Sequence, residues 1–214
     1  MQIKIKYDFE LSDFIVKGFR LFLFGETHGF VNDSEVQEKL LAHIKPNIFI
    51  YELLEDKKIT TINKFNEYLS KPDSEQFSVI STFGEIKPTI SLAKKYCKSM
   101  VGCDIKNMGR KDNSFLNETN LSNKKEIFES KLLKKREIHQ AKIINKTLNK
   151  EKGIIFVSIG AYHLRRESHL FNTIKDKFVI CYPTINGIQK FEPQKGMEEG
   201  DIEFIITDNE SYLK

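Results

Sequence analysis

Two hydrophobic patterns recur along the chain, and together they predict its fold. Short, nearly continuous apolar runs rich in Ile, Val and Phe are typical of strands that are covered on both faces. Between these runs lie segments with apolar residues three or four positions apart, which is the spacing of an amphipathic helix. We expect strands at 19–24, 47–53, 100–105, 154–159, 178–182 and 202–207, and an edge strand or hairpin arm at 3–7.

Helical segments separate most of the expected strands. The helix over 34–44 begins with a capping box, Ser34-x-x-Gln37, and Pro46 stops it. Further helices are expected at 62–69, 89–96, 124–148 and 164–175, and the polar stretch 106–123 is expected to form a loop or lid. This alternation predicts the α/β class, with a central, mostly parallel but mixed sheet and helices on both faces.

Length and composition are those of an ordinary globular domain. The chain has 214 residues, of which 40% are hydrophobic and 30% charged, so we expect one domain over 1–214. No apolar run approaches the roughly 20 residues that a membrane helix needs. The first ten residues mix charged with apolar side chains and form no signal core. We therefore expect a cytoplasmic protein without a membrane segment, whose oligomeric state stays open because the 202–207 strand could pair between chains.

Charge and cysteine content argue against nucleic-acid binding, a disulfide framework and a zinc site. The formal net charge is +4, and residues 121–152 alone hold ten Lys/Arg against four Glu. Only Phe128 lies among these charges, whereas a nucleic-acid surface needs aromatic side chains between its cations, so we expect a solvated helix face. The three cysteines, Cys97, Cys103 and Cys181, show no CxxC spacing and indicate neither a disulfide framework nor a thiolate zinc site.

Candidate chemistry gathers where the apolar runs end. Glu26 and His28 follow the first core strand, Glu52 the second and Asp104 the third, and Tyr162 and His163 follow the fourth. Because open α/β sheets bind ligands at the carboxyl ends of their strands, these side chains are expected to meet.

The two Gly-x-x-His turns, 25–28 and 160–163, are the sharpest part of this pattern. Each glycine lets the chain turn at the strand exit, and an imidazole follows three residues later. A single such histidine is more often a helix cap or a surface group. Two of them beside Glu26 and Glu52 favour a site.

For three residues the sequence leaves two explanations open, a place in the candidate site or an ordinary position exposed to solvent. Glu52 among apolar neighbours needs either a raised pKa or a cationic partner, although it could simply end a strand in solvent. Asp104 follows the same logic. Arg136 and His139 share a helix face with Leu132 and Ile143, and by spacing alone the solvated alternative is favoured for Arg136.

In combination, these motifs resemble a known superfamily. The elements are Gly25-Glu26-Thr27-His28, Glu52 at a strand end, Arg136 in a late helix, and Gly160-Ala161-Tyr162-His163. Their order is similar to that of the superfamily joining the Tiki and TraB proteins, the ChaN haem-binding proteins and the erythromycin esterases, over about residues 20–175. The resemblance implies one α/β domain whose paired motifs meet at a cleft. Its Tiki members are viewed as metal-dependent proteases, its esterase members as metal-free hydrolases with a histidine base, and its ChaN members bind haem.

Three functions remain open at this point. The first is a hydrolase of a small-molecule or peptide substrate, with Glu26, His28, Glu52, Arg136 and His163 as catalytic residues. In its metal form, His28, His163, Glu26 and Glu52 would bind Mn, Co or Zn with Glu26 or Glu52 as base, and in its metal-free form His28 activates water. In either form Arg136 would hold the oxyanion or a substrate carboxylate.

The second function is binding of haem or a small anion without turnover, with His28, His163 or Tyr162 as axial ligand. The third is an interaction module that has lost its chemistry and uses the basic helix 124–150 as its partner surface.

Overall fold

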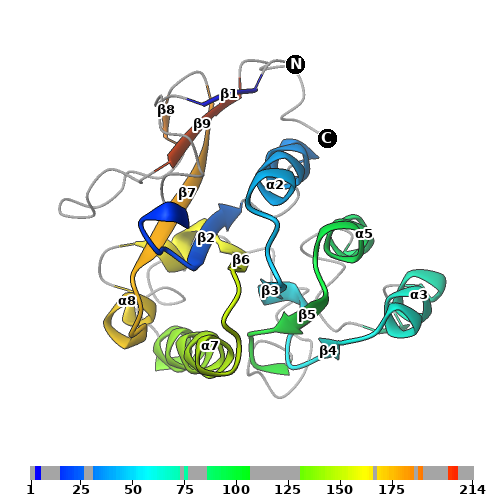
Figure 1. The fold of residues 1–214 in the computed structure, drawn as a ribbon. Helices are drawn as coiled ribbons and strands as arrows, with labels where there is room; N and C mark the ends of the chain where they lie inside the picture. Colours follow the sequence, from blue (N-terminus) through cyan, green and yellow to red (C-terminus); the bar gives the residue numbers. More distant parts are fainter. Residues whose placement is uncertain are drawn as a thin grey trace, which may run out of the picture.

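A single sheet organises the part of the chain that the structure, a computed structural model, describes. That part comprises residues 3–5, 15–26, 31–72, 75–76, 86–106, 131–165, 168–185, 188–189 and 202–206. The strands are β1 (Ile3–Ile5), β2 (Leu21–Glu26), β3 (Ile48–Tyr51), β4 (Lys58–Ile59), β5 (Ser99–Gly102), β6 (Ile155–Gly160), β7 (Phe178–Ile185), β8 (Ile188–Gln189) and β9 (Ile202–Ile206). They lie in the order β1-β9-β7-β2-β6-β3-β5-β4, and β8 pairs with β7 (Figure 1).

The sheet is mixed but mostly parallel, as the sequence predicted. The central pairs β7/β2, β2/β6, β6/β3 and β3/β5 are all parallel, so their carboxyl ends lie at one edge. The antiparallel pairs are β1 with β9, β4 with β5 and β8 with β7. Strand β9 pairs with both β1 and β7, so it is not the open edge strand that the sequence left possible.

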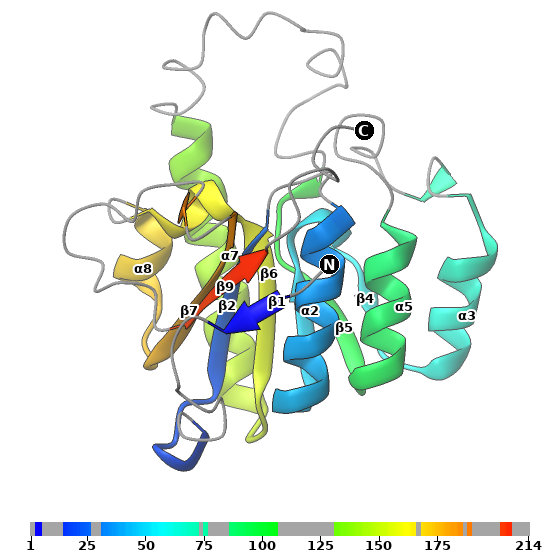
Figure 2. The same ribbon diagram turned by 90° about the horizontal axis from the view of Figure 1, so that it is seen from above.

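Helices cover both faces of the sheet, which confirms the predicted fold class. On one side lie α2 (Val31–Ile44), α3 (Ile62–Ser70) and α5 (Lys87–Tyr96), which stand side by side in Figure 2. On the other side lie α7 (Lys131–Lys150) and α8 (His169–Thr173), as Figure 1 shows.

The alternation of side chains along each strand supplies both hydrophobic cores. Phe22 and Phe24 of β2 pack with the α2 side, whereas Leu21 and Leu23 pack with Ala141 and its apolar neighbours on α7. Successive side chains of a strand point to opposite faces, so a strand buried on both sides is apolar at nearly every position. Among the described residues, no helix is both long and apolar enough to cross a membrane.

Two helix predictions need correction, and a third is tested only in part. Helix α2 begins at Val31, so Ser34 lies inside it, and an acidic side chain, Asp33, stands in its first turn, where the helix dipole favours negative charge. Helix α7 is described from Lys131 on, and the predicted start at 124 lies outside the described residues. The predicted loop or lid lies outside them too, apart from Lys106.

The second correction concerns the predicted helix over 164–175. After β6 the chain makes a short 3-10 turn, Ala161–Leu164, and Arg165 is extended. Ser168 then caps α8 by accepting a hydrogen bond from the Leu170 amide, and α8 spans only five residues. The tight turn keeps His163 beside the strand end, whereas an immediate helix would carry the chain away from it.

A glycine lets the turn after β3 pass closely over β5. Glu52–Leu54 form a 3-10 turn, and a Cβ built on Gly102 would lie 2.0 Å from the carbonyl oxygen of Glu55. The Gly102 amide also donates to the Lys57 carbonyl at 2.8 Å. The missing side chain thus lets the end of the turn that starts at Glu52 lie directly over β5.

Replacing Gly102→Ala is expected to lower the free energy of unfolding by at least about 2 kcal/mol, because the new methyl group meets backbone that cannot rotate away. Urea denaturation followed by circular dichroism measures the change. Ser99→Ala, at the half-buried start of the same strand, is the control and should change stability by less than about 0.5 kcal/mol. Equal stability of the two variants would contradict the close approach.

Candidate active site

A network of buried charges lies at the carboxyl edge of the sheet, on the side of α7. Glu52 is the first residue after β3, Asp104 comes two residues after β5, and His163 lies in the turn after β6. Arg136 and Glu137 come from α7. Glu52, Asp104 and His163 therefore arrive from three neighbouring strands, while one helix supplies a cation and an anion to meet them.

The carboxylate of Glu52 is the centre of this network. Its Oε1 accepts from Arg136 Nη2 at 2.7 Å and lies 3.1 Å from His163 Nε2, and its Oε2 accepts from the Gly160 amide at 2.6 Å. The side chain is 3% exposed. A carboxylate this deeply buried is stable only with such partners, so the cationic alternative predicted for Glu52 is the one that the structure shows.

Arg136 binds two carboxylates at once. Its Nε lies 3.0 Å from Asp104 Oδ2, and its Nη2 contacts both Asp104 and Glu52. Burial alone would lower the pKa of Arg136, but Asp104 and Glu52 outweigh it and raise the pKa above its usual value. The guanidinium charge is thus engaged within the protein, which corrects the solvated interpretation of Arg136.

Glu137 completes the network, and the motif analysis missed it. It is fully buried, its Oε1 accepts from Arg165 Nη1 and lies 3.3 Å from His163 Nδ1, and its Oε2 accepts from the His169 amide at 3.0 Å. Burial raises the pKa of Glu137, but hydrogen bonds from His163 and Arg165 reverse this effect, and the pKa ends below its usual value.

A sequence signal for Glu137 did exist. The buried stripe of α7 includes Leu133, Glu137, Gln140, Ala141 and Ile144, one position away from the stripe expected through Arg136 and His139. A glutamate inside an apolar stripe at helical spacing is the mark of a buried, paired carboxylate.

His163 lies between two carboxylates and is itself 5% exposed. Both ring nitrogens face carboxylate oxygens, of Glu52 and of Glu137, and an ionised carboxylate can only accept. Both nitrogens therefore carry protons, and the ring is an imidazolium. Burial lowers the pKa of His163, but the charge of Glu52 and the hydrogen bonds with Glu137 and Glu52 outweigh it and raise the pKa. Glu52, Asp104 and Glu137 are then balanced by Arg136, Arg165 and His163.

Glu26 belongs to a separate polar cluster. Its Oε2 accepts from Ser158 Oγ and lies 3.3 Å from Gln37 Nε2, which also lies 3.2 Å from Ser158 Oγ. Gln37 comes from α2, so this cluster faces the opposite side of the sheet from α7. Glu26 and Glu52 thus both lie at the carboxyl edge of the sheet, but their side chains face opposite sides of it. Strand β6 lies between their strands, β2 and β3.

The other predicted site residues are not part of this charge network as far as the structure describes them. His28 lies outside the described residues. Tyr162 is half-buried, and the Arg165 guanidinium stands 4.4 Å from its ring centroid. His139 is half-buried on α7, and among the described residues it makes no hydrogen bond or ion pair with the network.

None of the three cysteines forms a disulfide, and two of them are too weakly acidic to act as nucleophiles. Burial raises the pKa of Cys97 to about 12 and that of Cys103 well above its usual value. Thiols with such pKa values stay protonated and unreactive at neutral pH.

The described part of the predicted metal set does not suit a divalent cation. Both nitrogens of His163 are used by carboxylates, and both oxygens of Glu52 accept from protein donors, one of them the Arg136 guanidinium. A metal ligand needs a free lone pair, which an imidazolium lacks. Within the described part of the chain, no group of three or more His, Cys, Asp and Glu side chains could hold a metal ion.

The raised pKa of His163 predicts a stability that depends on pH. The charged ring stabilises the fold fully below its ordinary value of 6.5, and this contribution is lost as the pH rises through the higher pKa of the folded state. We expect the free energy of unfolding, measured with urea at several pH values from 6 to 9, to decrease as the pH rises. His163→Gln should remove it, whereas His43→Gln on the exposed face of α2 should keep it. An unchanged slope in His163→Gln would contradict the imidazolium.

Comparison with known proteins supports the fold. No family profile matches the sequence, and no curated protein sequence resembles it significantly. Two solved structures match almost the whole chain. One is ChaN of Campylobacter jejuni, described for its cofacial haem binding, with a TM-score of 0.52 and 13% identity over 94% of this chain and 93% of that one. The other is the type III effector HopBA1, with a TM-score of 0.53 and 14% identity over 97% of this chain and 98% of that one. The chain therefore shares the α/β fold of these two proteins.

Proposed function

We propose that this protein is a metal-free hydrolase of ester or amide bonds, whose reaction takes place at the carboxyl edge of β2, β6 and β3. The observation that carries the proposal is the Glu52 carboxylate, which is buried at a strand end and fixed by Arg136, His163 and the Gly160 amide. Buried ionisable groups with shifted pKa values concentrate at functional sites. The edge where Glu52 lies is also where sheets of this class bind ligands.

In this proposal His28 is the general base, which is the metal-free alternative that the sequence left open. It takes a proton from water, the water oxygen attacks the carbonyl carbon, and the proton passes to the leaving alkoxide or amine as the C–O or C–N bond breaks. Glu26, two positions earlier in the chain, is held by Ser158 and Gln37 and is the carboxylate assigned to orient this base.

The remaining residues act by holding Glu52 in place. Arg136 was predicted to bind an oxyanion, but its charge is engaged by Glu52 and Asp104. We therefore assign Arg136 and His163 to holding the Glu52 carboxylate in a fixed position at the strand end. A preorganised group that needs no rearrangement during the reaction is what lowers the barrier.

The test uses the full chain, chromogenic acyl esters of increasing length and a fluorogenic peptide library. We expect turnover of one class, a loss of at least about 100-fold in His28→Ala, and no change after EDTA treatment. His43→Ala, an exposed histidine on α2, is the control and should keep full activity.

Each contrary result refutes a different part. Turnover of no substrate refutes the hydrolase, retained activity in His28→Ala refutes the base, and loss of activity in EDTA refutes the metal-free mechanism. Melting temperatures of both variants establish that they are folded.

Haem binding is the second candidate, and the fold shared with ChaN favours it. His163 does not suit an axial ligand, because both of its nitrogens are engaged with carboxylates. Of the predicted ligands this leaves the Tyr162 phenol and His28. A tyrosinate is a known haem ligand in proteins, and Tyr162 lies in the turn after β6, at the carboxyl edge of the sheet.

This candidate predicts a saturable Soret shift when hemin is added, which Tyr162→Phe weakens at least tenfold. Tyr96→Phe on α5 is the control, since its hydroxyl is bonded to Glu38 on the far side of the sheet. A hemin titration without saturation, or equal binding by both variants, would exclude Tyr162 as a haem ligand.

A further inference from the structure

The outer face of α7 carries a dense group of lysines that the proposed site does not use. Buried residues of α7, among them Glu137, Gln140 and Ala141, point toward the sheet, and the exposed positions on the other side are almost all basic. The outer lysines, called the lysine face below, are Lys131, Lys134, Lys135, Lys142, Lys146 and Lys150.

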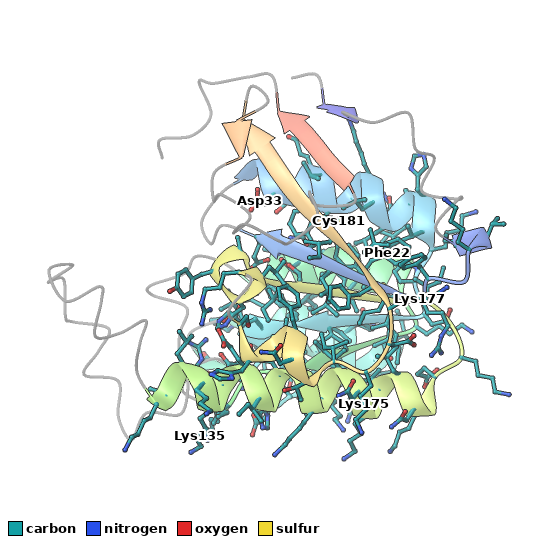
Figure 3. All side chains as sticks on the ribbon, turned by 90° about the vertical axis from the view of Figure 1, so that its left-hand side faces the viewer. Phe22, Asp33, Lys135, Lys175, Lys177 and Cys181 are labelled. Carbon is teal, nitrogen blue, oxygen red and sulfur yellow. The ribbon has the colours of Figure 1, made fainter. Side chains whose placement is uncertain are left out.

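The lysine face is continuous along the helix. At 100° per residue, all its members except Lys134 fall within an arc of roughly 100°, and the helix is roughly 30 Å long. Figure 3 shows Lys135 on the outer side of α7. Lys175 is also exposed and lies beside the helix, because its amide donates to Asn145 Oδ1 on α7.

These charges have no acidic partners within the described part of the chain. Exposed or half-buried lysines elsewhere do form ion pairs, as in Lys57–Glu55, Lys71–Glu67 and Lys95–Glu38. None of the six lysines does, although Lys131 and Lys135, like Lys142 and Lys146, stand four residues apart and repel each other. Such a face has a surplus positive charge that an external anion would neutralise.

The nearby carboxylates are already occupied or turned away. Glu137 is fully buried on the opposite side of α7. Asp176, which follows Lys175, binds Arg20 at 2.8 Å, and Glu151 is half-buried just after the helix end. No exposed acid within α7 itself interrupts the row.

We propose that the lysine face docks the protein onto an anionic phospholipid surface. Four to eight basic residues on one helix face are the number that binds acidic lipid headgroups. The face offers only lysines, which act as hydrated point charges, and lacks the arginines and exposed aromatic side chains that read nucleic acid. Docking here leaves the buried network of Glu52 on the other side of α7.

The test is sedimentation of the full chain with large vesicles of phosphatidylcholine alone or with 30% phosphatidylserine. We expect binding only to the acidic vesicles, and its loss in 500 mM NaCl. A variant with Lys135→Gln, Lys142→Gln, Lys146→Gln and Lys150→Gln should bind at least 100-fold more weakly, because each lysine contributes about a factor of five.

A matched variant removes four exposed lysines from the opposite side of the sheet or its edge, by Lys39→Gln, Lys58→Gln, Lys64→Gln and Lys98→Gln. It loses the same charge and should bind within about fivefold of the wild type. Circular dichroism establishes that both variants fold, which is expected since glutamine and lysine have similar helix propensities.

Three results would overturn the proposal. These are no binding of the wild type to acidic vesicles, an equal loss in both variants, and tighter binding to a labelled 20-base-pair DNA duplex than to acidic vesicles at the same salt concentration. The last result would assign the lysine face to nucleic acid instead. The hydrolase assay is independent of all three, because the substituted lysines lie outside the network.

Discussion

Each buried charge at the carboxyl edge of this sheet must be balanced by a partner of opposite charge, and the arrangement of the edge depends on this requirement. A carboxylate removed from water is costly unless cations and hydrogen-bond donors replace its hydration. Glu52 is nearly inaccessible and is held by Arg136, His163 and the Gly160 amide. Each of these cations needs a second anion, which Asp104 and Glu137 supply. The network therefore forms as a unit, and removing one member leaves the others uncompensated.

The order of the strands makes this network possible. In the chain β6 comes after β2, β3 and β5, but in the sheet it lies between β2 and β3. The turn after β6 thus delivers the Gly160 amide and His163 beside Glu52, at the end of the neighbouring strand. The alternation of side chains then separates the acids, since Glu52 meets α7 whereas Glu26 meets Gln37 of α2.

Helix α7 has three kinds of surface, an apolar face, residues of the buried charge network and an exposed basic face. Its apolar residues Ala141 and Ile144 pack on the sheet, and Arg136 and Glu137 enter the buried network. Its exposed outer positions are almost all lysines, which form no ion pair within the described part of the chain. The many lysines of this segment make Arg136 and Glu137 hard to single out in the sequence. In the structure these lysines lie on a different face of α7 from Arg136 and Glu137.

The sequence alone determined the class of the fold and the residues at the strand ends. Apolar runs covered on both faces demand a mostly parallel sheet between helices, and carboxyl ends gather polar groups, so Glu52, Asp104 and His163 could be predicted to lie near one another. Strand ends were accurate to a few residues because they depend on local patterning. The helix over 164–175 was wrong, because the turn around His163 is set by contacts with Glu52 and Glu137 rather than by local propensity.

Only the tertiary structure decided which charges meet. Helical spacing placed Arg136 and His139 on one stripe, but the stripe that faces the sheet is centred on Glu137 and Gln140, because the packing of Ala141 and Ile144 sets the rotation of α7. Likewise, Glu26 and Glu52 look equivalent in the sequence, and their separation onto opposite faces follows from side-chain alternation at the register of β2, β6 and β3. Pairing of buried charges is a property of three-dimensional neighbours, and no local pattern along the chain encodes it.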